Sequence, residues 1–333
     1  MKRHHKAYLA ILAALIILFA ANLVFGAIKI PFDAVLDILF KGGDGGRVTW
    51  RNILLQSRLP QAVTALLAGA SLAVSGLMLQ TLFQNPLAGP SILGISDGAN
   101  LGVAIMMLTF GSVNYISTIA AAFIGAAAIL IIVIQFSKRI KSAVMLLIIG
   151  IMIGYLASSA ISILNFKASA DKVHQFVLWG MGDFSNVSRE KLPWFAGSSI
   201  IGLAMAVLMI KPLNALLLGE NYASNLGVRI KPARIAILFC TGLLTASTTA
   251  FCGPISFIGL AVPHIARLSL GTSDHRHLLP VTLLMGCCIA LLCNLATNLP
   301  SGDALPLNAI TPIIGAPVVI YIIVNRKNIH YFN

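Results

Sequence analysis

Residues 62–83 contain no charged side chain. A run of about 20 apolar residues matches the thickness of the hydrocarbon core of a bilayer, so this stretch is expected to form a transmembrane helix. Alanine, glycine and serine recur through it, and small side chains let helix backbones approach closely inside a membrane. A lipid-facing helix would instead carry large residues all round. We therefore expect a helix packed against other helices, followed by breaks at Asn85-Pro86 and Gly89-Pro90.

Long uncharged runs of this kind recur along the chain. Hydrophobic residues make up 58% of the 333 residues and charged residues only 10%, whereas soluble domains carry about 25% charged residues. The composition predicts an all-α polytopic membrane protein that forms a single transmembrane domain over residues 1–333, with about ten transmembrane helices. The expected spans cover residues 7–27, 61–83, 92–110, 114–136, 143–165, 193–210, 235–250, 255–270, 279–298 and 307–324.

The lysine and arginine residues indicate the orientation of these spans. With the amino terminus inside, 14 of the 23 basic residues lie on the inner side and 9 on the outer side. The outer connections also hold seven of the ten acidic residues, so their net charge is only +2. The positive-inside rule therefore predicts that both termini are cytoplasmic. The basic residues end spans and do not cluster on a solvated face, so nucleic acid is not an expected partner.

The sequence lacks the patterns of several kinds of enzyme and metal site. The glycine-rich connection at residues 42–46 is not a phosphate loop, because the chain contains no Gly-Lys dipeptide. All five cysteines fall inside apolar runs without CxxC spacing, so neither a disulfide nor a metal site is expected. We expect no catalytic residues and no cofactor.

Two ionisable residues fall near the ends of the expected spans. Asp97 is expected to cap the helix that starts beside it, and His264 is expected to be a structural residue at a membrane boundary. A proton- or sodium-coupled carrier would need an ionisable group at mid-depth. The expected spans contain no such group at mid-depth, which argues against a secondary carrier, the rival interpretation from another class. A non-transporting membrane scaffold is a second rival, and the polar segment at residues 211–234 argues against it.

Residues 211–234 form a polar segment between two expected spans. Within it, the order Leu218-Gly219-Glu220-x-x-Ala223-x-x-Leu226-Gly227 has a short amphipathic period that ends in glycine. This pattern predicts two short helices joined by a tight turn on the cytoplasmic surface. An ordinary interfacial loop of similar composition is the alternative.

Several motifs together resemble the permease subunits of ABC importers for iron–siderophore, haem and cobalamin, which form the FecCD family. The resemblance runs from about residue 55 to 325. It rests on Arg58-Leu59-Pro60, Gly69-Ala70, Ser75-Gly76, Gln80, Asn85-Pro86-Leu87-Ala88, Leu93-Gly94-Ile95-Ser96, the 218–227 pattern, Gly253–Leu260, Pro263-His264, Arg267, Asp274-His275-Arg276 and Gly315-Ala316-Pro317.

This resemblance implies the fold of a type II ABC importer permease in the bacterial cytoplasmic (inner) membrane. It implies a homodimer of permeases, two ATP-binding subunits that carry out hydrolysis, and an extracytoplasmic substrate-binding protein. The implied cargo is an iron–siderophore complex or haem, with cobalamin as the alternative. The sequence does not separate these cargoes.

The resemblance also assigns roles to individual residues. The segment that docks the ATPase would use Leu218, Gly219, Glu220, Ala223, Leu226 and Gly227. An exposed Arg58 would pair with the binding protein, and Arg47 and Arg51 would share this role because Gln61 stands where many members carry a second arginine.

The family further implies that residues 143–165 line the passage between two copies. Ser158 and Ser162 stand four residues apart, so they share one helical face that Gly154 extends by a turn. A helix–helix contact would use the same small residues, and this alternative stays open.

Overall fold

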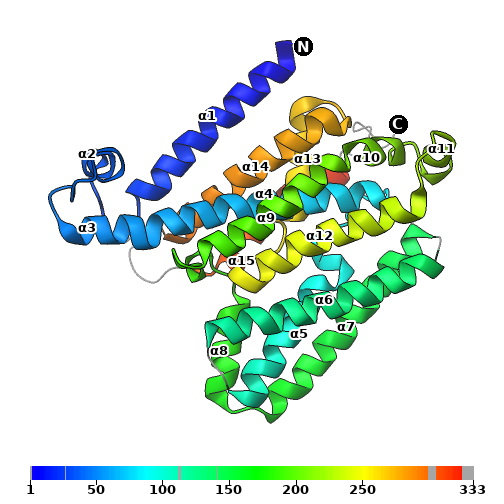
Figure 1. Cartoon of the computed structure of the whole chain (residues 1–333), viewed down its shortest axis with the longest axis horizontal. Helices are drawn as coiled ribbons and strands as arrows, with labels where there is room; N and C mark the ends of the chain where they lie inside the picture. The colour runs from blue at the N-terminus through cyan, green and yellow to red at the C-terminus, as the bar shows by residue number, and fades with distance from the viewer. Residues whose placement is uncertain (1, 27, 112–113, 141, 299–304, 325–333) are drawn as a thin grey trace.

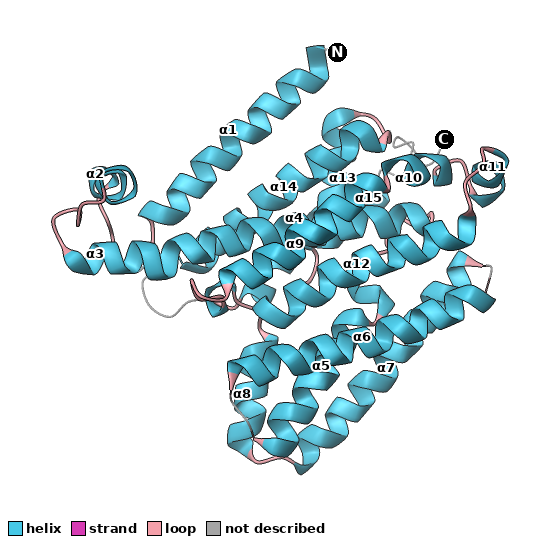
Figure 2. Cartoon of the chain, viewed as in Figure 1, coloured by secondary structure: helices cyan, strands magenta, loops and turns pink. Residues whose placement is uncertain are grey.

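The computed structural model describes residues 2–26, 28–111, 114–140, 142–298 and 305–324. Throughout these residues the regular structure is helical, with no β-strand (Figure 2). The predicted all-α fold is confirmed.

Six helices in the described ranges are long and apolar enough to cross a membrane. They are α1 (Lys2–Val24), α4 (Leu59–Leu82), α6 (Tyr115–Arg139), α7 (Ala143–Lys167), α12 (Ile230–Cys252) and α14 (His275–Asn298). A seventh candidate is the pair α9 (Leu192–Leu208) and α10 (Ile210–Leu216), which is bent by 53°.

Three shorter apolar helices complete the set of expected spans. They are α5 (Ile95–Ala104) with its π-helical continuation Ile105–Phe110, α13 (Ile258–Leu270) and α15 (Leu307–Val324). Each expected span therefore coincides with a helix or helix pair.

The expected polar connections are more helical than the sequence suggested. They contain α2 (Phe32–Leu36), α3 (Val48–Ile53), α8 (Ala170–Gly180) and α11 (Glu220–Asn225). A π-helical turn over Leu54–Arg58 joins α3 to α4, so one helical rod of 35 residues runs from Val48 to Leu82. The change in hydropathy near residue 60 therefore marks a change in the environment of this rod, and the helix itself begins earlier, at Val48.

Helix α4 lies at the centre of the molecule and packs against α9, α12, α13 and α14 (Figure 1). In the most apolar 18-residue stretch of its span, 83% is buried inside the protein, whereas the corresponding values are 22% for α6 and 28% for α7. A Cβ atom added at Gly69 would lie 2.2 Å from the carbonyl oxygen of Gly286, and one at Gly76 would lie 1.7 Å from that of Gly259. The small residues of α4 therefore allow backbone contact with α14 and α13, and the prediction of a packed helix is confirmed.

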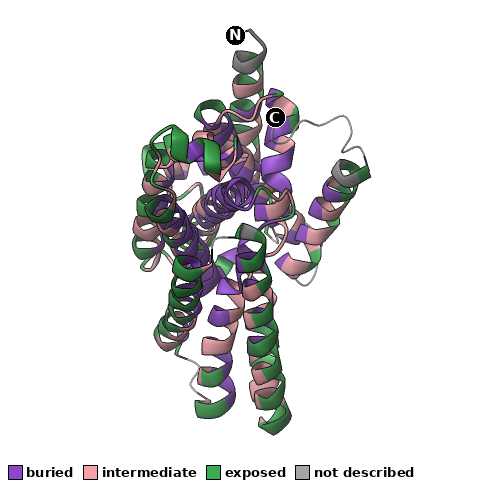
Figure 3. Cartoon of the chain, turned by 90° about the vertical axis from the view of Figure 1, so that its right-hand side faces the viewer, coloured by how far each residue is buried: buried purple, intermediate pink, exposed green. Residues whose placement is uncertain are grey.

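Helices α5, α6 and α7 form a second group beside this centre (Figure 1). A Cβ atom added at Gly125 of α6 would lie 2.0 Å from the carbonyl oxygen of Gly98 of α5, so these two helices also touch through their backbones. Helix α12 lies between the two groups and contacts both α4 and α6. Figure 3 shows buried residues gathered in the central helices and exposed residues on the outer ones.

Two non-helical segments interrupt the spans inside the protein. The first follows α4 and contains a 3₁₀ turn at Pro90–Leu93, and the second, residues 253–257, joins α12 to α13. The two segments lie close together, because a Cβ atom at Gly259 would be 2.7 Å from the Cδ atom of Pro90. Irregular backbone is tolerated at membrane depth where protein covers it or where it lines a cavity. The predicted breaks are confirmed.

The segments with predicted roles in docking lie at opposite ends of the molecule. Figure 1 shows α10 and α11 at one end, and α2 and α3 at the other. Arg326 and Lys327, which entered the orientation argument, lie outside the described residues.

Candidate functional site

The segment expected to contact an ATPase consists of two short helices. These are α10 and α11, and a turn that contains Gly219 joins them. Gly219 has φ of +94° and Gly227, after α11, has φ of +84°, a region that glycine enters without steric cost. The structure therefore has the helix–turn–helix arrangement that the sequence predicted. The segment is shorter than 211–234, because α12 already begins at Ile230.

The side chains of this segment divide into an outward and an inward set. Leu218 is 55% exposed and Leu226 is 64% exposed, whereas Ala223 is fully buried. Glu220 forms an ion pair with Arg234 of α12, and Arg234 also donates to the carbonyl oxygen of Ile140 at 2.8 Å. The inward set thus fixes α11 to α12 and to the end of α6, while the two leucines face outward.

A buried polar cluster joins α10 to the centre of the molecule. The Oδ1 atom of Asn214 accepts from the backbone N–H of His275 at 2.8 Å, and the Nδ1 atom of His275 lies 2.8 Å from the same oxygen. The Nε2 atom of His275 lies 2.9 Å from the hydroxyl oxygen of Thr81 in α4. Gln84 donates to the carbonyl oxygen of Leu216 at 3.0 Å. These hydrogen bonds connect α10 to the end of α4 and to the start of α14.

A second part of this cluster connects α4 with α13. Arg267 is 5% exposed and donates to the Oε1 atom of Gln80 at 2.7 Å. His264 is 1% exposed, and its Nε2 atom lies 2.7 Å from the carbonyl oxygen of Pro86. The charge count of the sequence includes Arg267 among the basic residues of the inner side, and the structure buries it. The sequence does carry one signal of this cluster. His264 and Arg267 are three residues apart, and this spacing places both side chains on one face of a helix.

The three outer arginines have different environments. Arg58 is buried, and its guanidinium donates to the carbonyl oxygens of Leu23 at 2.8 Å and Val24 at 2.7 Å, and also to that of Ile28. The expectation of an exposed Arg58 is therefore wrong. The physical reason is that the last carbonyls of α1 have no partner within their own helix, and Arg58 satisfies them.

Arg47 and Arg51 lie on the surface at this end of the molecule. The guanidinium carbon of Arg47 lies 4.9 Å from the centre of the Trp50 ring, and Arg51 forms an ion pair with Asp44 at 3.4 Å. Both side chains remain accessible to a partner.

Packing buries one part of the small-residue face of α7 and leaves the other part exposed. Ser158 and Ser162 are exposed, and the hydroxyl of Ser162 donates to the carbonyl oxygen of Ser158 at 3.0 Å. Gly154 is buried, because a Cβ atom there would lie 2.6 Å from the Oδ2 atom of Asp97. The expected accessible strip therefore includes the serines but not Gly154, which allows α7 to approach α5.

Asp97 does not cap α5, the helix that starts beside it. The N-cap residue of α5 is Gly94, without a side-chain hydrogen bond, and Asp97 lies in the first turn against Gly154. In the part of the chain that the structure describes, no group of three or more histidine, cysteine, aspartate and glutamate side chains could hold a metal ion.

The sequence model of the FecCD transport family matches residues 14–325. The chain belongs to the FecCD transport family. This FecCD chain is 36% identical over 274 residues to the vitamin B12 import system permease protein BtuC of Klebsiella pneumoniae, with 82% of each chain covered. It is 34% identical over 328 residues to the hemin transport system permease protein HmuU of Yersinia pestis, with 96% of this chain and 95% of that protein covered.

A solved structure described as an inward-facing ABC transporter of the metal-chelate type has the same fold. The TM-score is 0.84 at 30% identity, and the match covers 97% of this FecCD chain and 99% of the other. This FecCD protein is therefore a permease of the ABC transporter class, with the type II permease fold and several spans in the inner membrane.

Proposed function

We propose that this permease is the translocation subunit of an importer that moves an iron–siderophore complex or haem inward, with cobalamin as the alternative cargo. The relatives named for hemin and vitamin B12, and the one described as a metal-chelate transporter, support this range of cargo. In this proposal the whole chain is one transmembrane domain. Two copies form the passage, and two separate subunits bind and hydrolyse ATP.

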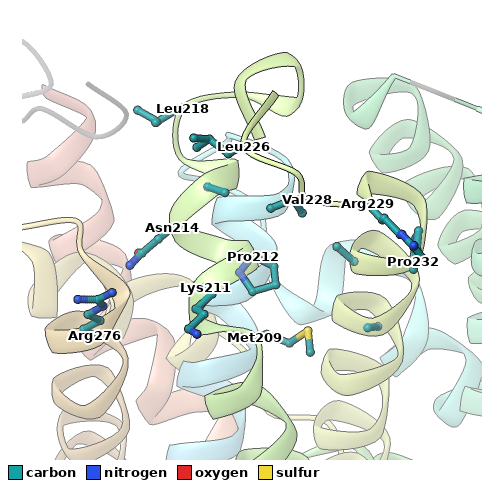
Figure 4. Close-up of a pocket in the computed structure, with 13 residues that line it drawn as sticks. Met209, Lys211, Pro212, Asn214, Leu218, Leu226, Val228, Arg229, Pro232 and Arg276 are labelled. Atoms are coloured by element: carbon teal, nitrogen blue, oxygen red, sulfur yellow. The ribbon is translucent and has the colours of Figure 1, made fainter. Parts of the chain in front are cut away.

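The observation that carries the proposal is the structure of residues 218–227. Two large apolar side chains, Leu218 and Leu226 (Figure 4), are exposed there on a segment whose other side is held by the Glu220–Arg234 ion pair and by the buried Ala223. Exposed apolar side chains on a firmly held segment are typical of a docking surface. We propose that this surface contacts the ATP-binding subunit, and that movement of that subunit reaches α4 and α14 through Asn214 and His275.

The opposite end has the features expected of a binding-protein dock. Arg47 and Arg51 are exposed there, and we propose that they pair with acidic residues of an extracytoplasmic binding protein. This assignment follows from the proposed orientation, in which α10 and α11 face the cytoplasm together with both termini. The passage between two copies is proposed to include Ser158 and Ser162 of α7.

A backbone substitution in the coupling turn tests the proposal. A Cβ atom at Gly227 would meet nothing within 4 Å, so Gly227→Val conflicts only with the φ of +84°. A non-glycine residue in this region costs about 1–3 kcal/mol, and a β-branched one is at the upper end. We expect the variant to insert normally, but reconstituted complexes should lose transport and substrate-stimulated ATP hydrolysis.

Gly42→Val is the matched control, because Gly42 also has a positive φ, +68°, and free space around its Cβ position. It lies at the other end of the molecule, and it should preserve coupling. Normal transport by Gly227→Val would contradict the docking role, and transport that continues without ATP would favour a secondary carrier. The cargo is identified by the small molecule that co-purifies with the binding protein.

A further inference from the structure

Asp97 lies near the middle of the membrane-spanning part of the protein, where the hydropathy of the sequence predicts no ionisable group. Its Oδ2 atom lies 2.6 Å from the position that a Cβ atom on Gly154 would occupy, and Gly154 is near the middle of the candidate span Val144–Lys167. The expected span 92–110 placed Asp97 close to one end. The apolar helix Ile95–Phe110 is shorter than the about 20 residues that cross a bilayer, so it starts at membrane depth.

The carboxylate of Asp97 has no partner in the part of the chain that the structure describes. Neither of the two ion pairs formed by described residues includes it, and no hydrogen bond between described residues reaches it. The expected spans hold only two basic side chains, Arg267 and His264, and both are buried against α4 and the turn that follows it. A second copy of the same chain therefore offers no basic partner at this depth.

Asn100 supplies a second acceptor on the same side of α5. Residues three apart are neighbours on a helix surface, so Asn100 lies beside Asp97. Its Oδ1 atom is buried and accepts no hydrogen bond from the described residues. Buried polar atoms are nearly always hydrogen-bonded, so these two neighbouring acceptors are suited to receive donors from a molecule other than this chain.

Asp97 also continues the polar strip of α7. Ser158 and Ser162 are exposed, one and two turns beyond Gly154 on the same face. Because Gly154 has no side chain, the carboxylate of Asp97 occupies the place that a side chain would take in this strip. Asp97 is half-buried, so part of it reaches the surface on which the two serines lie.

The depth of Asp97 limits what it can face. A carboxylate exposed to lipid at this depth is costly, and intramembrane acids almost always face protein or a water-filled cavity. Protein would have to supply a positive charge or a hydrogen-bond donor, which neither the described residues nor a second copy provides. The water-filled passage proposed between two copies satisfies the carboxylate.

We propose that Asp97 is a charge-selecting residue in the wall of this passage. Two copies place two such carboxylates around the route. They attract cargo that presents ammonium, N–H or O–H groups and repel cargo of net negative charge. The inference rests on the proposed function, because it needs the passage, and it narrows the proposed range of cargo to complexes without net negative charge.

The test measures which charge the passage admits in the assembled transporter. After the five cysteines are replaced, Ser158→Cys reports on water beside Asp97. Its rates of reaction are measured at low ionic strength with a cationic trimethylammonium methanethiosulfonate and with an anionic sulfonate methanethiosulfonate. The test variant is Asp97→Asn, which keeps the shape and removes the charge. The control is Asp33→Asn, which removes the same charge from an exposed residue of α2.

We expect the cationic reagent to be favoured when Asp97 is present. Four helical residues rise about 6 Å, and a unit charge at this distance changes the local concentration of a monovalent ion about threefold in water. Asp97→Asn should therefore lower the ratio of the cationic rate to the anionic rate about tenfold, without a change in the thermal midpoint. Asp33→Asn should leave the ratio unchanged.

The outcomes separate this inference from the proposed function. If position 158 reacts but the ratio is the same in Asp97→Asn and the wild type, the inference is overturned while the passage stands. If position 158 is unreactive in every nucleotide state, both are overturned. Uptake that persists without ATP, follows a proton or sodium gradient and is lost in Asp97→Asn would overturn charge selection and assign the carboxylate to ion coupling.

Discussion

Replacement of Arg58 by alanine tests whether this residue attaches α1 to the rest of the protein or docks the binding protein, the role that the sequence motifs suggest. Its guanidinium donates to three carbonyl oxygens at and after the end of α1. A hydrogen bond that involves a charged group contributes about 1.5–3 kcal/mol, and each buried carbonyl oxygen that is left without a partner costs about 1–3 kcal/mol. An exposed ion pair would contribute only about 0–1 kcal/mol. We therefore expect Arg58→Ala to weaken the attachment of α1 by about 3 kcal/mol or more.

The assay is thermal unfolding of the purified permease, followed by fluorescence-detected size exclusion. A loss of this size should lower the midpoint by at least about 5 °C, since larger domains shift by about 2–4 °C per kcal/mol. Arg51→Ala is the control, because Arg51 is exposed and has one ion pair, with Asp44, and it should shift the midpoint by less than about 2 °C. If Arg58→Ala unfolds at the temperature of the wild type while its affinity for the binding protein falls, the structural role is refuted.

Three further predictions concern docking, the passage and the packing of α4. The double variant Arg47→Ala/Arg51→Ala should bind the binding protein more weakly, by about 1–2 kcal/mol at low salt and less at high salt, and an affinity that does not depend on ionic strength would exclude these residues. After replacement of the five buried cysteines, cysteines at 158 and 162 should react with water-soluble thiol reagents in a nucleotide-dependent way, whereas one at 154 should not. Unreactive cysteines at both serine positions would place this face of α7 against protein or lipid. Gly76→Ala should destabilise the permease by several kcal/mol, since its Cβ atom would lie 1.7 Å from a backbone oxygen, whereas Gly197→Ala, with nothing within 4 Å, should be nearly neutral in a thermal melt.

The sequence predicted the spans well because the signal for each is local. A run of apolar residues marks a helix without reference to its neighbours, and the breaks at Asn85-Pro86 and Gly89-Pro90 depend only on proline and glycine. The central position of α4 was also predictable, because small residues such as Gly69 and Gly76 have a use only where another backbone approaches.

The environments of single polar residues could not be predicted in the same way. Arg58 is buried because residues about 30 positions earlier present unpaired carbonyl oxygens, and nothing near Arg58 in the sequence reports this. Asp97 lies against Gly154 of a different helix, which removes that glycine from the expected accessible strip. The partners of His275, Asn214 and Thr81, come from helices that are distant in sequence.

The contacts of α4 with α13 and α14 also determine where the permease can bend. Gly69 and Gly76 bring backbones together with no side chain between them, and such contacts do not allow one helix to slide over another without steric overlap. Helices α4, α13 and α14 must then move as a single rigid body. We expect any hinge between outward- and inward-open forms to lie in the two connections that are not α-helical, residues 83–94 from α4 to α5 and residues 253–257 from α12 to α13. The contacts that link Asn214, His275 and Thr81 connect α10 directly to these three helices, so in the proposed coupling a rotation of α10 acts on all three helices together.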